Sequence, residues 1–86
     1  MHIELSAEVM FQDLGDEAIL LDIDKGYYYG LDAVGTRFWQ LMSAGHDLDA
    51  AVAELLAVYD VDETTLRADL DALMTELQET GLVVIS

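Results

Sequence analysis

The sequence predicts an α+β fold in which a small N-terminal antiparallel sheet precedes three helices. Residues up to 31 form short apolar segments separated by turn signals, which is typical of strands. Beyond residue 32 the apolar residues recur every three or four positions, which is typical of helices. With 86 residues and 53% hydrophobic content, the chain has enough apolar material for one modest core. We therefore expect a single domain over residues 1–86.

Three strands are expected to form an antiparallel meander. In the first, Val9 and Phe11 share one side, and the second is more continuously apolar and therefore central. Asp24–Gly26 predicts a hairpin loop whose glycine takes the left-handed conformation. The predicted strands are residues 8–12, 18–23 and 27–31.

Each of the three predicted helices begins after an aspartate that can cap it, at Asp32, Asp47 or Asp62. The first helix is expected to run to about residue 42, and Gly81 is expected to stop the third. The apolar tail of residues 82–85 is expected to be extended, and it could pair with the sheet or pack on the helices. The helix pair after the sheet has the proportions of a winged helix-turn-helix.

The charge balance excludes nucleic acid and anionic membranes as partners. Eighteen acidic residues against three basic ones give a net charge of −15, which repels phosphates. The helix that would read DNA carries only Arg67 as a base. No apolar run approaches the roughly 20 residues that span a bilayer. The absence of cysteine fits a reducing compartment, so we expect a cytoplasmic protein.

Metal binding, cofactor binding and catalysis find no support in the motifs. Asp22 and Asp24 begin like a calcium loop, but Tyr27 stands where that loop needs glycine. His2 and His46 have no partner at ligand spacing. Neither a glycine-rich phosphate loop nor a nucleophile with a recognisable base is present. We expect no metal, no cofactor and no enzymatic activity.

The third predicted strand has no covalent neighbour on its outer side. By alternation Tyr27, Tyr29 and Leu31 share the face toward the helices, while Tyr28 and Gly30 share the other face. The tyrosines could simply complete a small core. Alternatively, the edge is kept open so that a peptide can add a strand. Gly30 could allow close approach of that peptide or mark a bulge.

The ordered set of motif residues resembles the PqqD-like proteins, the recognition elements of ribosomally made, post-translationally modified peptides (RiPPs). In the sheet and first helix the matching residues are Leu21, Asp22, Gly26, Tyr28, Tyr29, Leu31, Asp32, Gly35, Phe38, Trp39, Leu41 and Met42. In the second half they are Tyr59, Val61, Leu70, Leu73, Leu77, Gly81 and Leu82. The short, acidic, free-standing form is most similar to the leader-binding proteins of lasso peptide biosynthesis.

The resemblance implies a non-catalytic protein that binds the leader segment of a precursor peptide. The leader would add as a strand to residues 27–31, lie against the third helix and be delivered to a leader peptidase. The peptide-binding residues expected on this basis are Tyr27, Tyr28, Tyr29, Gly30, Leu31, Arg67, Leu70, Asp71, Leu73 and Met74. An outer patch of Met10, Leu20 and Tyr28 is expected to contact the peptidase.

Two other functions stay open. One is a PqqD-type peptide chaperone for a cofactor-maturing radical enzyme. The other is a dimerising adaptor module that has no peptide ligand.

Overall fold

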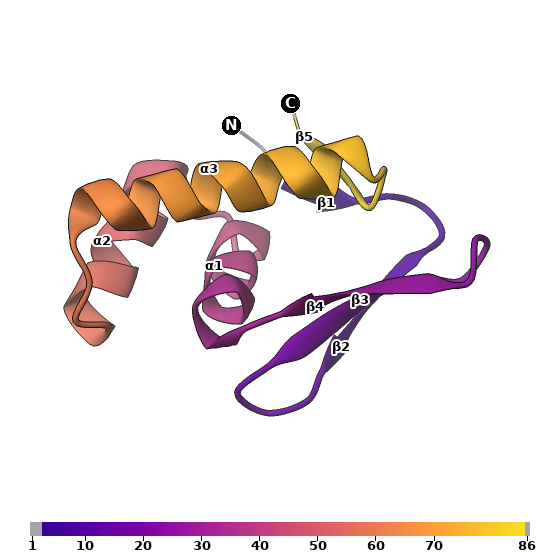
Figure 1. Ribbon diagram of the computed structural model, residues 1–86, viewed down its shortest axis with the longest axis horizontal. Coiled ribbons are helices and arrows are strands. Elements are labelled where there is room, and N and C mark those ends of the chain that lie inside the picture. The colour runs from indigo at the N-terminus through magenta and orange to yellow at the C-terminus, as the bar shows by residue number, and fades with distance from the viewer. Residues whose placement is uncertain (1–2, 86) are drawn as a thin grey trace.

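The computed structural model describes residues 3–85, and over this range the chain forms five strands and three helices (Figure 1). The α+β class predicted from the sequence is confirmed. In chain order the elements are β1 (Ile3–Leu5), β2 (Val9–Asp13), β3 (Ala18–Asp22), β4 (Tyr27–Leu31), α1 (Ala33–Ser43), α2 (Leu48–Val58), α3 (Glu63–Glu79) and β5 (Val83–Ile85).

The predicted meander is present as the antiparallel sheet β2–β3–β4, with strand bounds within one residue of those expected. Gly26 has φ +75°, as predicted for the hairpin loop, and its N–H donates to the carbonyl oxygen of Asp22 at 2.8 Å. β4 pairs with β3 residue for residue, so Gly30 lies opposite Ile19 without a bulge.

A second sheet joins the two ends of the described chain. β1 and β5 pair antiparallel, with Leu5 opposite Val83. The C-terminal tail therefore pairs as a strand, but with β1 rather than with the meander. The sequence did not predict β1, because three residues are too few to display an alternating period.

All three predicted helix caps are confirmed. The side-chain oxygen of each capping aspartate accepts the N–H of the residue three positions later. These pairs are Asp32–Gly35 at 2.8 Å, Asp47–Ala50 at 2.8 Å and Asp62–Thr65 at 3.2 Å. Gly81 ends α3 with φ +80°, and the N–H of Leu82 turns back to the Leu77 carbonyl.

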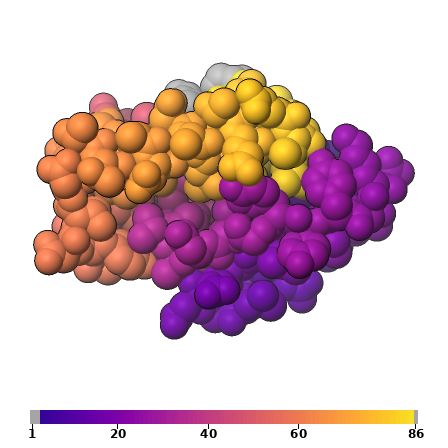
Figure 2. All heavy atoms as spheres, in the orientation of Figure 1, coloured from indigo at the N-terminus to yellow at the C-terminus, as the bar shows by residue number. Residues whose placement is uncertain are grey.

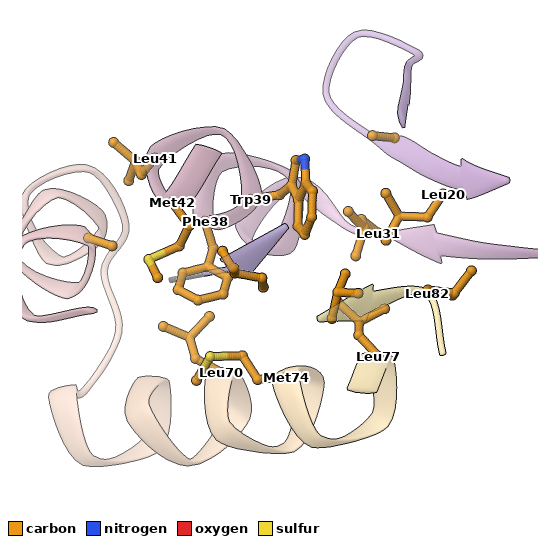
Figure 3. Packing of buried hydrophobic residues seen from close by; sticks show 14 of the residues in the cluster. Leu20, Leu31, Phe38, Trp39, Leu41, Met42, Leu70, Met74, Leu77 and Leu82 are labelled. Atoms are coloured by element: carbon orange, nitrogen blue, oxygen red, sulfur yellow. The ribbon is translucent and has the colours of Figure 1, made fainter. Parts of the chain in front are cut away.

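The core lies between the meander, β1–β5 and the three helices. Figure 3 shows Leu70 and Met74 of α3 pointing toward Phe38 of α1. Phe38 is 1% exposed, and Leu20 of β3 is fully buried. This packing holds α3 alongside β4, and the two elements run in opposite directions in Figure 1.

Candidate functional site

β4 is an edge strand: within residues 3–85, no strand pairs with its outer side. The pairing of β3 determines which backbone groups of β4 face that side. The N–H of Ile23 donates to the Glu8 carbonyl at 2.9 Å, so the backbone of Ile23 faces toward β2. Because successive residues of a strand face opposite neighbours, the backbone of Asp22 faces β4.

The same alternation applies along β4. Tyr27 lies opposite Asp22 and turns its backbone toward β3. Tyr28 and Gly30, at the alternate positions, therefore turn their N–H and C=O groups toward the free edge. Two donors and two acceptors along this edge are left without a strand partner inside the described chain.

A groove with a volume of about 310 Å³ lies between β4, the start of α1 and the first half of α3, and we also call it the cavity. Figure 2 shows its borders, with the orange and yellow surface of α3 above the magenta surface of β4 and α1. Most of its lining residues are apolar, and Asp32, Thr65 and Asp69 add polar groups. The lining consists of Tyr29, Gly30, Leu31, Asp32, Val34, Gly35, Val61, Thr65, Leu66, Asp69, Leu70 and Leu73.

Gly35 keeps this cavity open where α1 passes close to α3. A Cβ on Gly35 would lie 3.2 Å from Oδ1 of Asp32, the atom that caps α1, and 3.5 Å from Cδ2 of Leu73. A side chain here would therefore press on the cap and on the wall of the groove at once. Because Gly35 has no side chain, the first turn of α1 can form the end of the cavity.

Two tyrosine hydroxyls connect β4 to the C-terminal half of α3. Tyr27 donates to the Thr80 carbonyl at 2.6 Å, and Tyr29 donates to Oε2 of Glu76 at 3.0 Å. Burial raises the pKa of the Tyr29 phenol, and the hydrogen bond to Glu76 raises it further. Both rings lie on the helix-facing side, as the alternation predicted, whereas Tyr28 is 68% exposed on the other side.

The structure brings half of the predicted peptide-binding residues to the cavity. These are Tyr29, Gly30, Leu31, Leu70 and Leu73. Tyr27 and Tyr28 belong to the same strand but do not line the cavity. Met74 is 6% exposed and belongs to the core, and Asp71 is exposed on α3.

Arg67 turns away from the cavity and is held by two carboxylates. Its Nε lies 2.9 Å from Glu63 on the same helix, and its Nη2 lies 3.1 Å from Asp49 on α2. Both hydrogen bonds raise the pKa of the guanidinium. Arg67 does not line the cavity. Its expected role in binding a peptide carboxylate stays a prediction.

Several lining residues were missed by the sequence reasoning. Leu66 and Asp69 lie four residues and one residue before Leu70, and helical spacing places Leu66 on the same face as Leu70. That spacing could have identified Leu66. Val61 precedes α3 and Val34 lies in the first turn of α1. Val61 is one of the motif residues that carry the family resemblance, but neither valine was expected to line a groove.

The predicted outer patch is wrong at one position. Leu20 is fully buried and faces the helices, so it cannot be part of an outer surface. The cross-strand row on the outer face is instead Met10, Leu21 and Tyr28, directly opposite one another across three strands. Because side chains alternate along a strand, the error of one residue moved the prediction to the opposite face.

The described part of the chain contains neither a cluster of metal ligands nor a helix suited to spanning a membrane. Residues 3–85 contain no group of three or more potential ligands that could hold a metal ion. His46 Nδ1 lies 3.1 Å from the Leu41 carbonyl oxygen, and His2 lies outside the described residues. No helix in that range has the length and apolar character needed to cross a membrane.

Comparisons with known proteins agree with this arrangement. The family model of coenzyme PQQ synthesis protein D (PqqD) matches residues 17–83, which is more than half of the chain. A solved structure described as TbiB1 in complex with the TbiA(beta) leader peptide is 35% identical, with 93% of each chain covered and a TM-score of 0.82.

A second solved structure, described as lasso peptide synthetase B1 complexed with the leader peptide, is 26% identical. The alignment covers 99% of this chain and 100% of the other, with a TM-score of 0.89. The comparison with curated proteins gives no match.

Proposed function

The chain belongs to the family of coenzyme PQQ synthesis protein D, and from this membership we propose that it binds the leader segment of a ribosomally made precursor peptide without catalysing a reaction. The observation that carries the proposal is the free edge of β4 beside an apolar groove. An extended peptide can satisfy the outward backbone groups of such an edge while its alternate side chains enter adjoining pockets.

The leader pairs antiparallel with β4 through the backbone of Tyr28 and Gly30. Leader residues opposite Tyr29 and Leu31 then have their side chains on the helix-facing side, because directly opposed residues share a face. These two side chains enter the groove, where Leu70 and Leu73 form the wall on α3. A few backbone bonds and two buried side chains suffice for micromolar affinity, about −8 kcal/mol.

The pathway that we propose is lasso peptide biosynthesis, in the cytoplasm. The support is that two similar structures are described as bound to leader peptides, one of them a lasso peptide synthetase B1. Residues 1–86 act as one recognition domain that delivers the leader to a peptidase. The family name leaves a cofactor-pathway peptide as the alternative ligand.

The leader peptidase docks, in this proposal, on the outer row of Met10, Leu21 and Tyr28. Met10 is 52% exposed and Tyr28 is 68% exposed, which leaves an apolar strip on the sheet. Met10→Lys should weaken association with the purified peptidase encoded beside this gene, measured by calorimetry. Val84→Lys is the matched control, because Val84 is 57% exposed on the other sheet. Equal weakening by both variants would remove the outer row from the proposal.

The binding experiment titrates a fluorescent synthetic leader, taken from the neighbouring precursor gene, into the pure protein. We expect saturable binding that Leu73→Asp abolishes, because an unpaired carboxylate in the groove wall would be buried against an apolar side chain of the leader at a high cost in free energy. Leu56→Asp is the matched control: Leu56 is also a half-buried leucine packed on the core, but it lies on α2 outside the groove. Leu70 is unsuitable for this test, since it is 2% exposed and its replacement by aspartate would report on folding.

Binding that survives Leu73→Asp in a folded protein would remove the groove from the proposal. No saturable binding to the wild type would contradict leader recognition itself. In that case, concentration-dependent self-association through the free edge of β4 would identify the dimerising adaptor instead.

A further inference from the structure

We infer that Gly30 forms a notch on the outer face of β4 that receives one bulky apolar or aromatic side chain of the bound strand. This inference rests on the proposed function, because it specifies which residue of the peptide the edge selects. It concerns the face of the sheet opposite the groove, so the leader is recognised on both sides of the strand.

The fold itself gives no reason for glycine at this position. Gly30 is not among the glycines with positive φ, and a Cβ built on it would meet nothing within 4 Å. It pairs with Ile19 in unbroken register, which excludes the bulge that glycine often marks. Glycine inside a strand lowers stability relative to residues with a side chain. Glycine at this position therefore lowers the stability of the free protein without a structural reason, and contact with a ligand can explain its presence.

Strand geometry fixes where the complementary side chain lies. The backbone groups of Gly30 face the free edge, so the peptide residue opposite it exchanges both hydrogen bonds with Gly30. The side chain of that residue lies on the same face as the missing side chain of Gly30, which is the outer face. Its two neighbours in the peptide face Leu31 and Tyr29 and enter the groove.

The surroundings of the notch determine the class of side chain. Tyr28, two residues earlier on the same face, is 68% exposed, and the half-buried Ile19 lies directly across from Gly30 on β3. A large apolar or aromatic side chain that lies across the glycine covers the Tyr28 ring and the Ile19 side chain together. Aromatic residues placed opposite an edge glycine stabilise sheets in this way.

The test is a compensation experiment between Gly30→Leu and a set of leader peptides in which each position is replaced in turn by glycine. The probe is the synthetic leader of the neighbouring precursor gene. Gly30→Leu should fold like the wild type, because its side chain has free space. The variant should lower the affinity for the unmodified leader about tenfold, because the leucine side chain fills the notch.

At one leader position, glycine should weaken binding to the wild type but restore binding to Gly30→Leu. Gln12→Leu is the matched control: Gln12 is exposed in the same cross-strand row, two strands from the free edge, and the variant should bind like the wild type. The notch is contradicted if Gly30→Leu binds the leader with wild-type affinity, or if its affinity for every peptide falls by the same factor. Either result leaves leader binding itself intact. If the wild type binds no leader, the proposed function fails as well.

Discussion

At the scale of single residues, the tyrosines of β4 have two separate roles. Tyr27 and Tyr29 use their hydroxyls to hold the strand against α3, and Tyr29 also lines the cavity. Tyr28 points the other way and leaves its ring exposed. The sequence left open whether the tyrosines complete the core or border an open edge. In the structure Tyr27 and Tyr29 pack toward the core, whereas Tyr28 is exposed on the other face.

The Tyr29 phenol makes stability sensitive to alkaline pH. Its pKa is raised in the folded protein, first by burial and then by Glu76, so folding favours the neutral phenol. That contribution is fully present below the ordinary tyrosine pKa of about 10 and is lost as pH rises through the higher folded value. The difference in unfolding free energy between wild type and Tyr29→Phe should therefore shrink at alkaline pH in urea denaturation. A difference that stays constant with pH would contradict this account.

At the scale of elements, the helices and the meander could be predicted because their signals are local. Each helix has its own aspartate cap, and the loop ending in Gly26 has a recognisable turn composition. β1 could not be predicted, since within residues 3–85 it pairs only with β5, and this pairing connects segments that are far apart in the sequence. Leu20 was assigned to the wrong face because the sequence of β3 is apolar on both faces and shows no alternation, although the burial of its residues does alternate.

The candidate site was only partly predictable for a similar reason. β4 could be assigned correctly, and Leu70 and Leu73, which the family resemblance implied as peptide-binding residues, do line the cavity. Arg67 was expected at the groove from the family resemblance, but it pairs with two carboxylates, one of them on α2, and does not line the cavity. Val61 and Val34 enter the lining through the way that α1 and α3 approach each other, which depends on tertiary packing.

The small β1–β5 sheet should contribute to stability through one face only. Val83 is 3% exposed and Val84 is 57% exposed, so Val83→Ala should lower the unfolding free energy by about 1–2 kcal/mol through loss of buried methyl groups. Val84→Ala, the matched control in the same strand, should change it by less than about 0.5 kcal/mol. Urea denaturation of both variants measures the difference. Equal effects would contradict the described register of β1 and β5.

At the scale of the whole molecule, charge and shape favour a peptide over nucleic acid. The net charge is −15, and the three cations lie on separate elements: Lys25 in the β3–β4 loop, Arg37 on α1 and Arg67 on α3. Such a surface has no cationic stripe that could follow a phosphate backbone. What the fold offers instead is an unpaired strand edge between an apolar groove and an apolar sheet face.

The central claim, that the leader pairs with the free edge of β4, is tested most directly by amide hydrogen exchange with and without the synthetic leader. In the free protein the amides of Tyr28 and Gly30 should exchange quickly, while those of Tyr29 and Leu31 are protected by β3. Saturation with leader should slow exchange at Tyr28 and Gly30 by at least about tenfold. Unchanged exchange at these two amides, despite saturated binding, would show that the leader binds elsewhere and would contradict strand addition to β4.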